Sequence, residues 1–213
     1  MGAADHLTML PVRSLAVRYR VLFFGLLLAA ASSAAAQQTI LDLDPGKTSV
    51  KFSLGDVLHT VHGAFRLQRG RLELEPMSGL VSGEIVVDAR SGDSGNSIRD
   101  RKMHREILQS DQFPEISFRP DRIEGPVVSP GQSSVKVHGI FRIHGVDREI
   151  TVPAGVELAA DHWTAKVHFT VPYAKWGMKN PSTLFLRVSD SVEIDLTAGG
   201  SVTQKASSIG GKP

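Results

Sequence analysis

The residues of this sequence best suited to chemistry are its eight histidines, because the chain contains no cysteine. A chain without cysteine has no disulfide framework, thiol nucleophile, cysteine-ligated metal or lipid-modified N-terminal cysteine. The closest histidine pair, His59 and His62, is three residues apart, and such positions in a strand point to opposite faces. His62, His138 and His168 share the outward phase of their runs and could be neighbours across strands, but solvated surface histidines are the favoured interpretation. The sequence therefore predicts no metal site and no cofactor.

Patterns that mark catalytic sites are also missing. We find no G-x-S-x-G elbow, no phosphate-binding loop and no dinucleotide fingerprint. Asp190 is the charged residue in the inward phase of its run, and an enzyme acting on a small apolar substrate would need such a group. That enzyme is an alternative hypothesis; the prediction is a protein that is not an enzyme.

Two other groups of residues could contact a ligand. Arg99, Asp100 and His104 lie together on a predicted helix, where an arginine could meet the phosphate or quinone oxygen of an amphiphile's head group. Helix capping by Asp100, with Arg99 paired to it, is the alternative. Trp176 and Met178 fall on a loop between two runs, where they could line the mouth of a barrel. The alternative there is a loop folded back onto the barrel rim.

The elements that would position these residues are strands, since apolar residues recur at every second position from Thr48 onward. Eight or nine such runs, with polar residues between the apolar ones, predict an all-β antiparallel sheet with one buried face. Small inward residues such as Gly63 and Gly139 favour an eight-stranded barrel over a sandwich. A barrel of that size is either filled by its own side chains or holds one small ligand, and both remain open.

An open barrel would have a channel lined by inward aromatic and aliphatic side chains. The predicted channel residues, besides Trp176 and Met178 at the mouth, are Phe52, Phe65, Ile85, Val87, Phe118, Phe141, Val167, Phe169, Leu186 and Val188. A solid core built from the same residues is the alternative.

The strand pattern is interrupted once, between residues 91 and 114. Ser97 followed by Asp100 is typical of a helix start, with Ser97 as the N-cap and Asp100 three positions later. We predict a short helix near residues 97–110 that lies over the barrel. Its predicted apolar stripe is Ile98, Met103, Ile107 and Leu108.

Residues 1–36 have the pattern of a secretory signal peptide. Three arginines precede the apolar run 21–30, and alanines up to Ala36 suit a cleavage site. The run is shorter than the about 20 residues that span a membrane, although an uncleaved anchor is the alternative. Cleavage takes 24 basic and 22 acidic side chains to 21 of each, so nothing in the charge predicts nucleic-acid binding. We expect a periplasmic or secreted protein, cut near Ala36, with no transmembrane span in the mature chain.

The other end of the chain offers little. Residues 199–213, rich in glycine and serine, are predicted to be a disordered tail after a barrel domain at 39–198. An exposed sheet face could support a homodimer, although no periodicity marks one.

Four stretches, in this order, carry a resemblance to a known family. They are LDLDPGKTSVKF at 41–52, SIRDRKMH at 97–104 with FPEISF at 113–118, VHGIFRIHGV at 137–146, and VSDSVEI at 188–194. Together they resemble the YceI-like, polyisoprenoid-binding family of exported bacterial proteins, over residues 39–197. The resemblance implies an extended, lipocalin-like barrel of eight antiparallel strands, with a helical insert and an apolar channel for an isoprenoid tail. Residues 173–182 do not map onto the family pattern.

The resulting hypothesis is an exported, non-enzymatic protein that sequesters or carries an isoprenoid lipid, either a polyprenyl chain or an isoprenoid quinone. The alternative is an envelope stress or interaction protein whose barrel is filled by side chains and whose loops bind a partner.

Overall fold

The structure is a computed structural model that describes residues 38–56, 59–183 and 187–205. The predicted signal peptide at 1–36, the predicted channel residue Leu186, and residues 206–213 therefore lie outside the described residues. The strands are β1 (Gln38–Leu43), β2 (Ser49–Gly55), β3 (Thr60–Glu75), β4 (Leu80–Asp93), β5 (Glu115–Glu124), β6 (Gly131–Ile143), β7 (Val146–Leu158), β8 (His162–Val171) and β9 (Val192–Lys205). The helical segments are η1 (Pro45–Lys47), α1 (Ser97–Lys102) and the π-helical turn η2 (Met103–Ile107). Among the described residues, none of the helical segments has the length and apolar character of a membrane-spanning helix.

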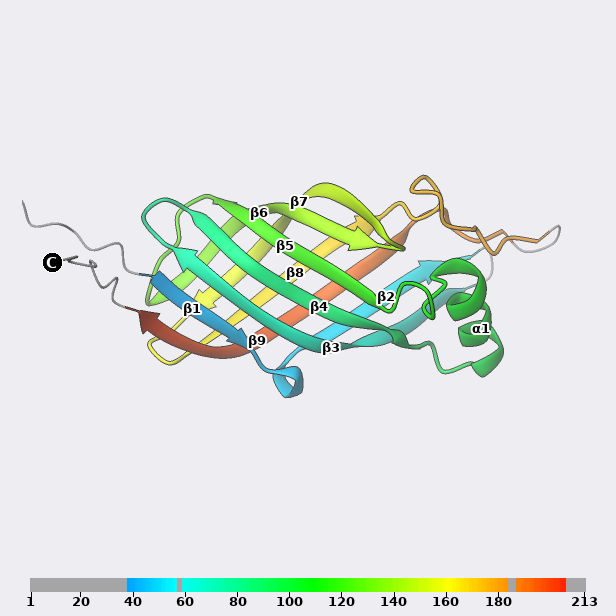
Figure 1. Ribbon diagram of the computed structural model, residues 1–213, viewed down its shortest axis with the longest axis horizontal. Helices are drawn as coiled ribbons and strands as arrows, with labels where there is room; N and C mark the ends of the chain where they lie inside the picture. The colour runs from blue at the N-terminus through cyan, green and yellow to red at the C-terminus, as the bar shows by residue number, and fades with distance from the viewer. Residues whose placement is uncertain (1–37, 57–58, 184–186, 206–213) are drawn as a thin grey trace, which may run out of the picture. The chain divides into compact units, whose positions relative to one another are not determined.

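The sheet closes on itself. Its order around the ring is β3-β2-β9-β8-β7-β6-β5-β4, all pairs are antiparallel, and β4 pairs back with β3 (Figure 1). Closure removes the unpaired edges that an open sheet would expose. The predicted all-β barrel with eight strand positions and a short helical insert is confirmed.

The strands β1 and β2 occupy one position of this ring between them. Both pair with β3 on one side and β9 on the other. The strand β1 pairs with the C-terminal halves of β3 and β9, and β2 pairs with their N-terminal halves. The turn η1 separates them, with the side chain of Asp44 accepting a hydrogen bond from the backbone N–H of Gly46 at 2.8 Å. Nine strands therefore make an eight-position barrel because one strand is interrupted.

The pairing with β1 also changes the end of the domain. The prediction of a tail from residue 199 is wrong for residues 199–205, which continue β9 and pair with β1 as far as Gln38 and Lys205. Glycine suits this strand because a side chain on Gly200 would overlap the carbonyl oxygen of Asp42. Gly200 thus allows a close strand approach within a strand instead of belonging to a flexible linker.

Alternation places the apolar residues on the inside of the barrel. In β2, Val50 and Phe52 are buried, whereas Lys51 between them is exposed. Gly63 lies opposite Phe52 in β3, and a side chain there would overlap the Phe52 ring. One small inward residue thus makes room for a large one on the neighbouring strand.

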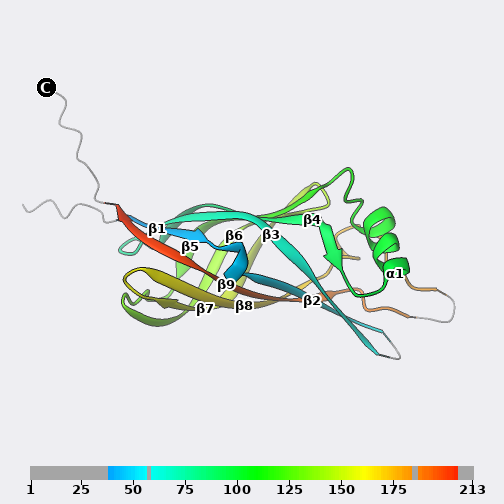
Figure 2. The ribbon, with the colours of Figure 1, turned by 90° about the horizontal axis from the view of Figure 1, so that it is seen from below.

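The helix lies at the end of the barrel where β4 ends, opposite the start of β1 and the end of β9 (Figure 2). We call this the helix end; it also includes the β6–β7 turn at 144–145 and the segment 172–183 that follows β8. The N-cap is Asn96, not the predicted Ser97, since the Asn96 side chain accepts hydrogen bonds from the backbone of Ile98 and Arg99. Ile98 is 75% exposed, so its predicted place in the apolar stripe is wrong.

Candidate functional site

An internal cavity of about 260 Å³ runs through the barrel. Every strand contributes to its lining, as do Met103 and Ile107 of η2 at the helix end. None of the described lining residues is charged, and the side chains among them with polar atoms are those of Ser117, Trp163 and Tyr173. The indole N–H of Trp163 donates to the backbone oxygen of Asp42, and the Tyr173 hydroxyl to that of Ser189. The cavity therefore suits an apolar ligand that makes few hydrogen bonds within it.

Most of the predicted channel residues meet around this cavity. Its lining includes Phe52, Phe65, Ile85, Val87, Phe118, Phe141, Val167, Phe169 and Met178. Neither Trp176 nor Val188 lines it; Val188 instead forms an isolated bridge with Asp56 beyond the end of β2.

Aromatic side chains make up part of the wall. The ring centroids of Phe52 and Phe65 are 5.3 Å apart, and Phe141 meets Phe169 edge to face at 5.8 Å. Both pairs lie within the range of centroid separations at which aromatic rings attract one another beyond the burial of their surface.

The segment after β8 folds back over the helix end. The hydroxyl of Tyr173 donates to the backbone oxygen of Ser189 at 2.6 Å, and the backbone N–H of Met178 to that of Tyr173 at 3.1 Å. Met178 is thereby buried against the cavity, while Trp176 packs against Phe141 with ring centroids 6.1 Å apart. Burial, together with the charge of Asp190, raises the pKa of Tyr173 to about 12.

Arg148 is a residue at this end that the sequence analysis missed. It lies two residues before Ile150 and four before Val152, which both line the cavity. Arg148 therefore continues the row of inward-facing residues of β7, called its inner row, by one position. Its guanidinium carbon lies 5.7 Å from the ring centre of Trp176, and Nη2 donates to the Trp176 backbone oxygen at 3.1 Å. Its Nε is buried and has no hydrogen-bond partner among the described residues. The signal for it was present, because the alternation that began at Ile150 extends backwards to Arg148.

Comparison with protein families identifies this barrel. The YceI-like domain matches residues 41–199, well over half of the chain. The chain belongs to the YceI-like domain family. Comparison with curated proteins gives no match.

Solved structures share the fold of this YceI-like chain. Burkholderia cenocepacia BcnA is 18% identical with a TM-score of 0.61, and the match covers 75% of this chain and 99% of BcnA. A polyisoprenoid binding domain from Saccharophagus degradans is 15% identical with a TM-score of 0.57, over 81% of this chain and 99% of that domain. The Campylobacter jejuni YCEI protein is 14% identical with a TM-score of 0.51, over 62% and 79%. At these identities the likeness is one of fold.

In this YceI-like barrel, the predicted head-group residues lie together around the loop before α1. Arg99 donates to the hydroxyl and the backbone oxygen of Ser94, and Asp100 accepts from the backbone N–H and the hydroxyl of the same residue. His104 makes hydrogen bonds with the backbone oxygen of Gly92 and the hydroxyl of Ser110. None of the three lines the cavity. Their contact with a head group stays a prediction.

The outward histidines of the YceI-like barrel each contact carboxylates or hydroxyls nearby instead of one another. His138 makes hydrogen bonds with Asp121 at 2.7 Å and Glu149 at 2.8 Å, which raise its pKa above the usual value of 6.5. Among the described residues, no group of three or more histidines and carboxylates is arranged to hold a metal ion. The inward placement predicted for Asp190 is wrong: it is exposed, outside any strand, and accepts a hydrogen bond from Asn180 at 2.7 Å.

Proposed function

We propose that this protein is an exported, non-enzymatic carrier that sequesters an isoprenoid lipid, with the tail inside the barrel. The observation that carries this proposal is the cavity of about 260 Å³ with no charged residue among its described lining residues. A barrel filled by its own side chains would leave no such space. The cavity therefore favours a lipid carrier over an envelope interaction protein with a closed core.

The energetics of an apolar tail fit this function. Each methylene group moved from water into the cavity contributes about 0.8 kcal/mol, so a farnesyl tail offers on the order of 10 kcal/mol before the costs of association and ordering. The net affinity is weaker than this gross value, because the costs of association and ordering are subtracted from it.

The identity of the tail is supported by family and fold. A polyisoprenoid binding domain shares this fold, and the chain belongs to the YceI-like domain family. A polyprenyl chain and an isoprenoid quinone share the branched, flexible tail that a long cavity of aliphatic and aromatic side chains accommodates. Export is supported by the basic and apolar pattern of residues 1–36 and by the alanines before the expected cut.

The test is native mass spectrometry of the protein purified without detergent from the periplasmic or secreted fraction, followed by organic extraction and identification of the lipid. We expect a stoichiometric isoprenoid adduct on a chain that begins at Gln37. A mass that stays free of adduct after incubation with quinones and polyprenyl phosphates would contradict the carrier function. A chain that retains its first 36 residues would contradict cleavage.

A further inference from the structure

We propose that Arg148 binds an anionic head group, a phosphate or a carboxylate, of the lipid whose tail occupies the cavity. This inference rests on the proposed carrier function and adds the chemistry of the ligand's polar end. It starts from the position of Arg148 on the inner row of β7, one step beyond the cavity-lining Ile150. The residue paired with it on β6, Phe141, also lines the cavity. Arg148 is itself outside the cavity lining, so its charge stands just beyond the point where the apolar channel reaches the helix end.

The charge of Arg148 has no ion-pair partner among the described residues. Its sequence neighbour Asp147 faces outward and pairs with Arg119 at 3.1 Å and with Arg142 at 3.4 Å. Glu149, the other neighbour, contacts His138 on the same outer face. Placing a cation in partly buried surroundings without a counter-ion is unfavourable, and an anionic ligand would remove that penalty.

The guanidinium has unused hydrogen-bonding capacity. Arginine carries five N–H donors, and the described residues supply one acceptor, the backbone oxygen of Trp176. The Nε–H is shielded from water and unsatisfied within the described part of the chain. An oxygen of a phosphate or carboxylate is the acceptor that the fork of N–H groups suits best.

Trp176 holds this group in place. Its ring covers the guanidinium at 5.7 Å while its backbone oxygen accepts from Nη2. The same ring contacts Phe141 of the cavity wall, so the head-group position and the tail channel share one aromatic side chain. A lipid bound here would have its tail along the barrel and its head beneath the segment that carries Trp176.

The test compares three probes that share a tail: farnesol, farnesyl phosphate and farnesoic acid. Their affinities are measured by calorimetry for the wild-type mature protein and for Arg148→Gln. Arg142→Gln is the matched control, because Arg142 lies near the same end of the barrel but faces outward and pairs with Asp147. We expect wild type to bind an anionic probe at least about tenfold more tightly than farnesol, from charge-assisted hydrogen bonds. Arg148→Gln should lose that preference with farnesol binding unchanged, and Arg142→Gln should keep it.

The outcomes separate this inference from the function it rests on. If wild type binds none of the probes, the carrier function fails and the head-group site with it. All probes could bind while Arg148→Gln keeps the wild-type preference for an anionic probe, or while Arg142→Gln loses that preference to the same extent. Either result would show that the Arg148 site is wrong and would leave the carrier function standing. The anion that loses more affinity in Arg148→Gln identifies the head group as phosphate or carboxylate.

A second measurement needs no variant that might fold poorly. The Nε–H resonance of Arg148 in wild type should shift when farnesyl phosphate or farnesoic acid is added, and stay in place when farnesol is added. An unchanged resonance at saturation with either anion would overturn the assignment.

Discussion

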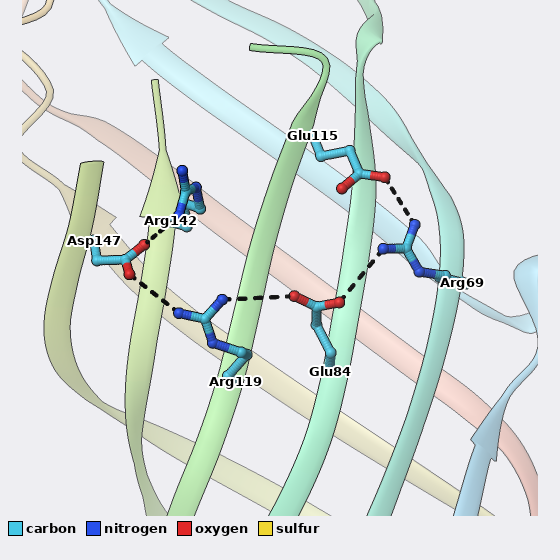
Figure 3. Close-up of polar contacts among 6 residues, drawn as sticks. All are labelled: Arg69, Glu84, Glu115, Arg119, Arg142 and Asp147. Atoms are coloured by element: carbon cyan, nitrogen blue, oxygen red, sulfur yellow. Dashed lines mark hydrogen bonds and ion pairs between the residues drawn. The ribbon is translucent and has the colours of Figure 1, made fainter. Parts of the chain in front are cut away.

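The guanidinium of Arg69 on β3 lies 2.8 Å from the carboxylate of Glu115 on β5, so this ion pair reaches across β4, which lies between them. Figure 3 shows that the pair continues into a row of alternating charges on the outer face. Glu84 on β4 contacts both Arg69 and Arg119, and Asp147 on β7 contacts Arg119 and Arg142. The row ties five neighbouring strands together on the side away from the cavity.

The first prediction concerns this row. Glu115→Gln should lower the free energy of unfolding by about 0.5 kcal/mol at neutral pH, since exposed ion pairs contribute little individually. The hydrogen bond from Arg69 holds the pKa of Glu115 below its usual value of 4.5. Its stabilisation is therefore present above that value and is lost as the pH falls through the lowered pKa. Urea denaturation of wild type and Glu115→Gln, from neutral pH to below pH 4.5, measures this difference in the free energy of unfolding. The control is Glu157→Gln, which removes an exposed carboxylate of β7. A difference that persists in strong acid would contradict the ion pair as its source.

The second prediction concerns His138. Its pKa is raised by hydrogen bonds to Asp121 and then Glu149, so its contribution to stability is complete below pH 6.5 and is lost as the pH rises through the raised pKa. His138→Gln should thus lower the Tm more in mild acid than at alkaline pH. The control is His62→Gln, whose ring contacts the hydroxyl of Ser53. An NMR titration of His138 with a midpoint at or below 6.5 would count against this view.

The third prediction uses Tyr173, which is the sole tyrosine of a chain beginning at Gln37. Its phenolate absorbance should appear at pH about 12 in the folded protein, against 10.0 for an ordinary tyrosine. Because its pKa is raised in the folded state, stability should fall as the pH rises from 10 towards 12. Tyr173→Phe should show no phenolate signal and should cost about 1 kcal/mol of stability through the lost hydrogen bond to Ser189. A midpoint near 10 in the folded protein would mean that the ring is exposed.

The fourth prediction tests the cavity from within. Val167→Phe places a ring in the space that the tail would occupy and should weaken farnesol binding about tenfold, by displacing the equivalent of two methylene groups. Thr164→Phe adds the same ring to the exposed face of β8 and should leave binding unchanged. Thermal melts of both variants check that the barrel is intact. Equal affinities for the two variants would place the ligand elsewhere.

The fifth prediction concerns the start of α1. Asn96→Ala should destabilise the helix by about 1 kcal/mol, because its side chain satisfies two backbone N–H groups, whereas Ser97→Ala should have little effect. Amide hydrogen exchange at Ile98 and Arg99 measures the opening of this turn. Faster exchange in Ser97→Ala than in Asn96→Ala would reverse the assignment of the cap.

The barrel and most of its inner surface could be predicted because a strand has a period of two. Once Phe141 is inside, so are Val137 and Gly139, and the same rule places Phe169 with Val167. The rule needs no knowledge of which strands are neighbours. The rule holds as far as Arg148 at the start of β7, which is in phase with Ile150. It fails outside the strands, where Asp190, just before β9, does not take the inward position that alternation predicts.

Local patterns in the sequence predict a barrel of alternating strands, most of the residues that face its interior, and a helix that interrupts it near residue 97. The arrangement of the barrel ends depends on the tertiary structure. It joined β1 to β9 and so made a strand of residues 199–205, and it buried Met178 while setting Trp176 over Arg148. This division arises because inward or outward phase follows from local backbone geometry. Contacts between loops and strand ends depend on segments far apart in the chain, and no local pattern encodes them.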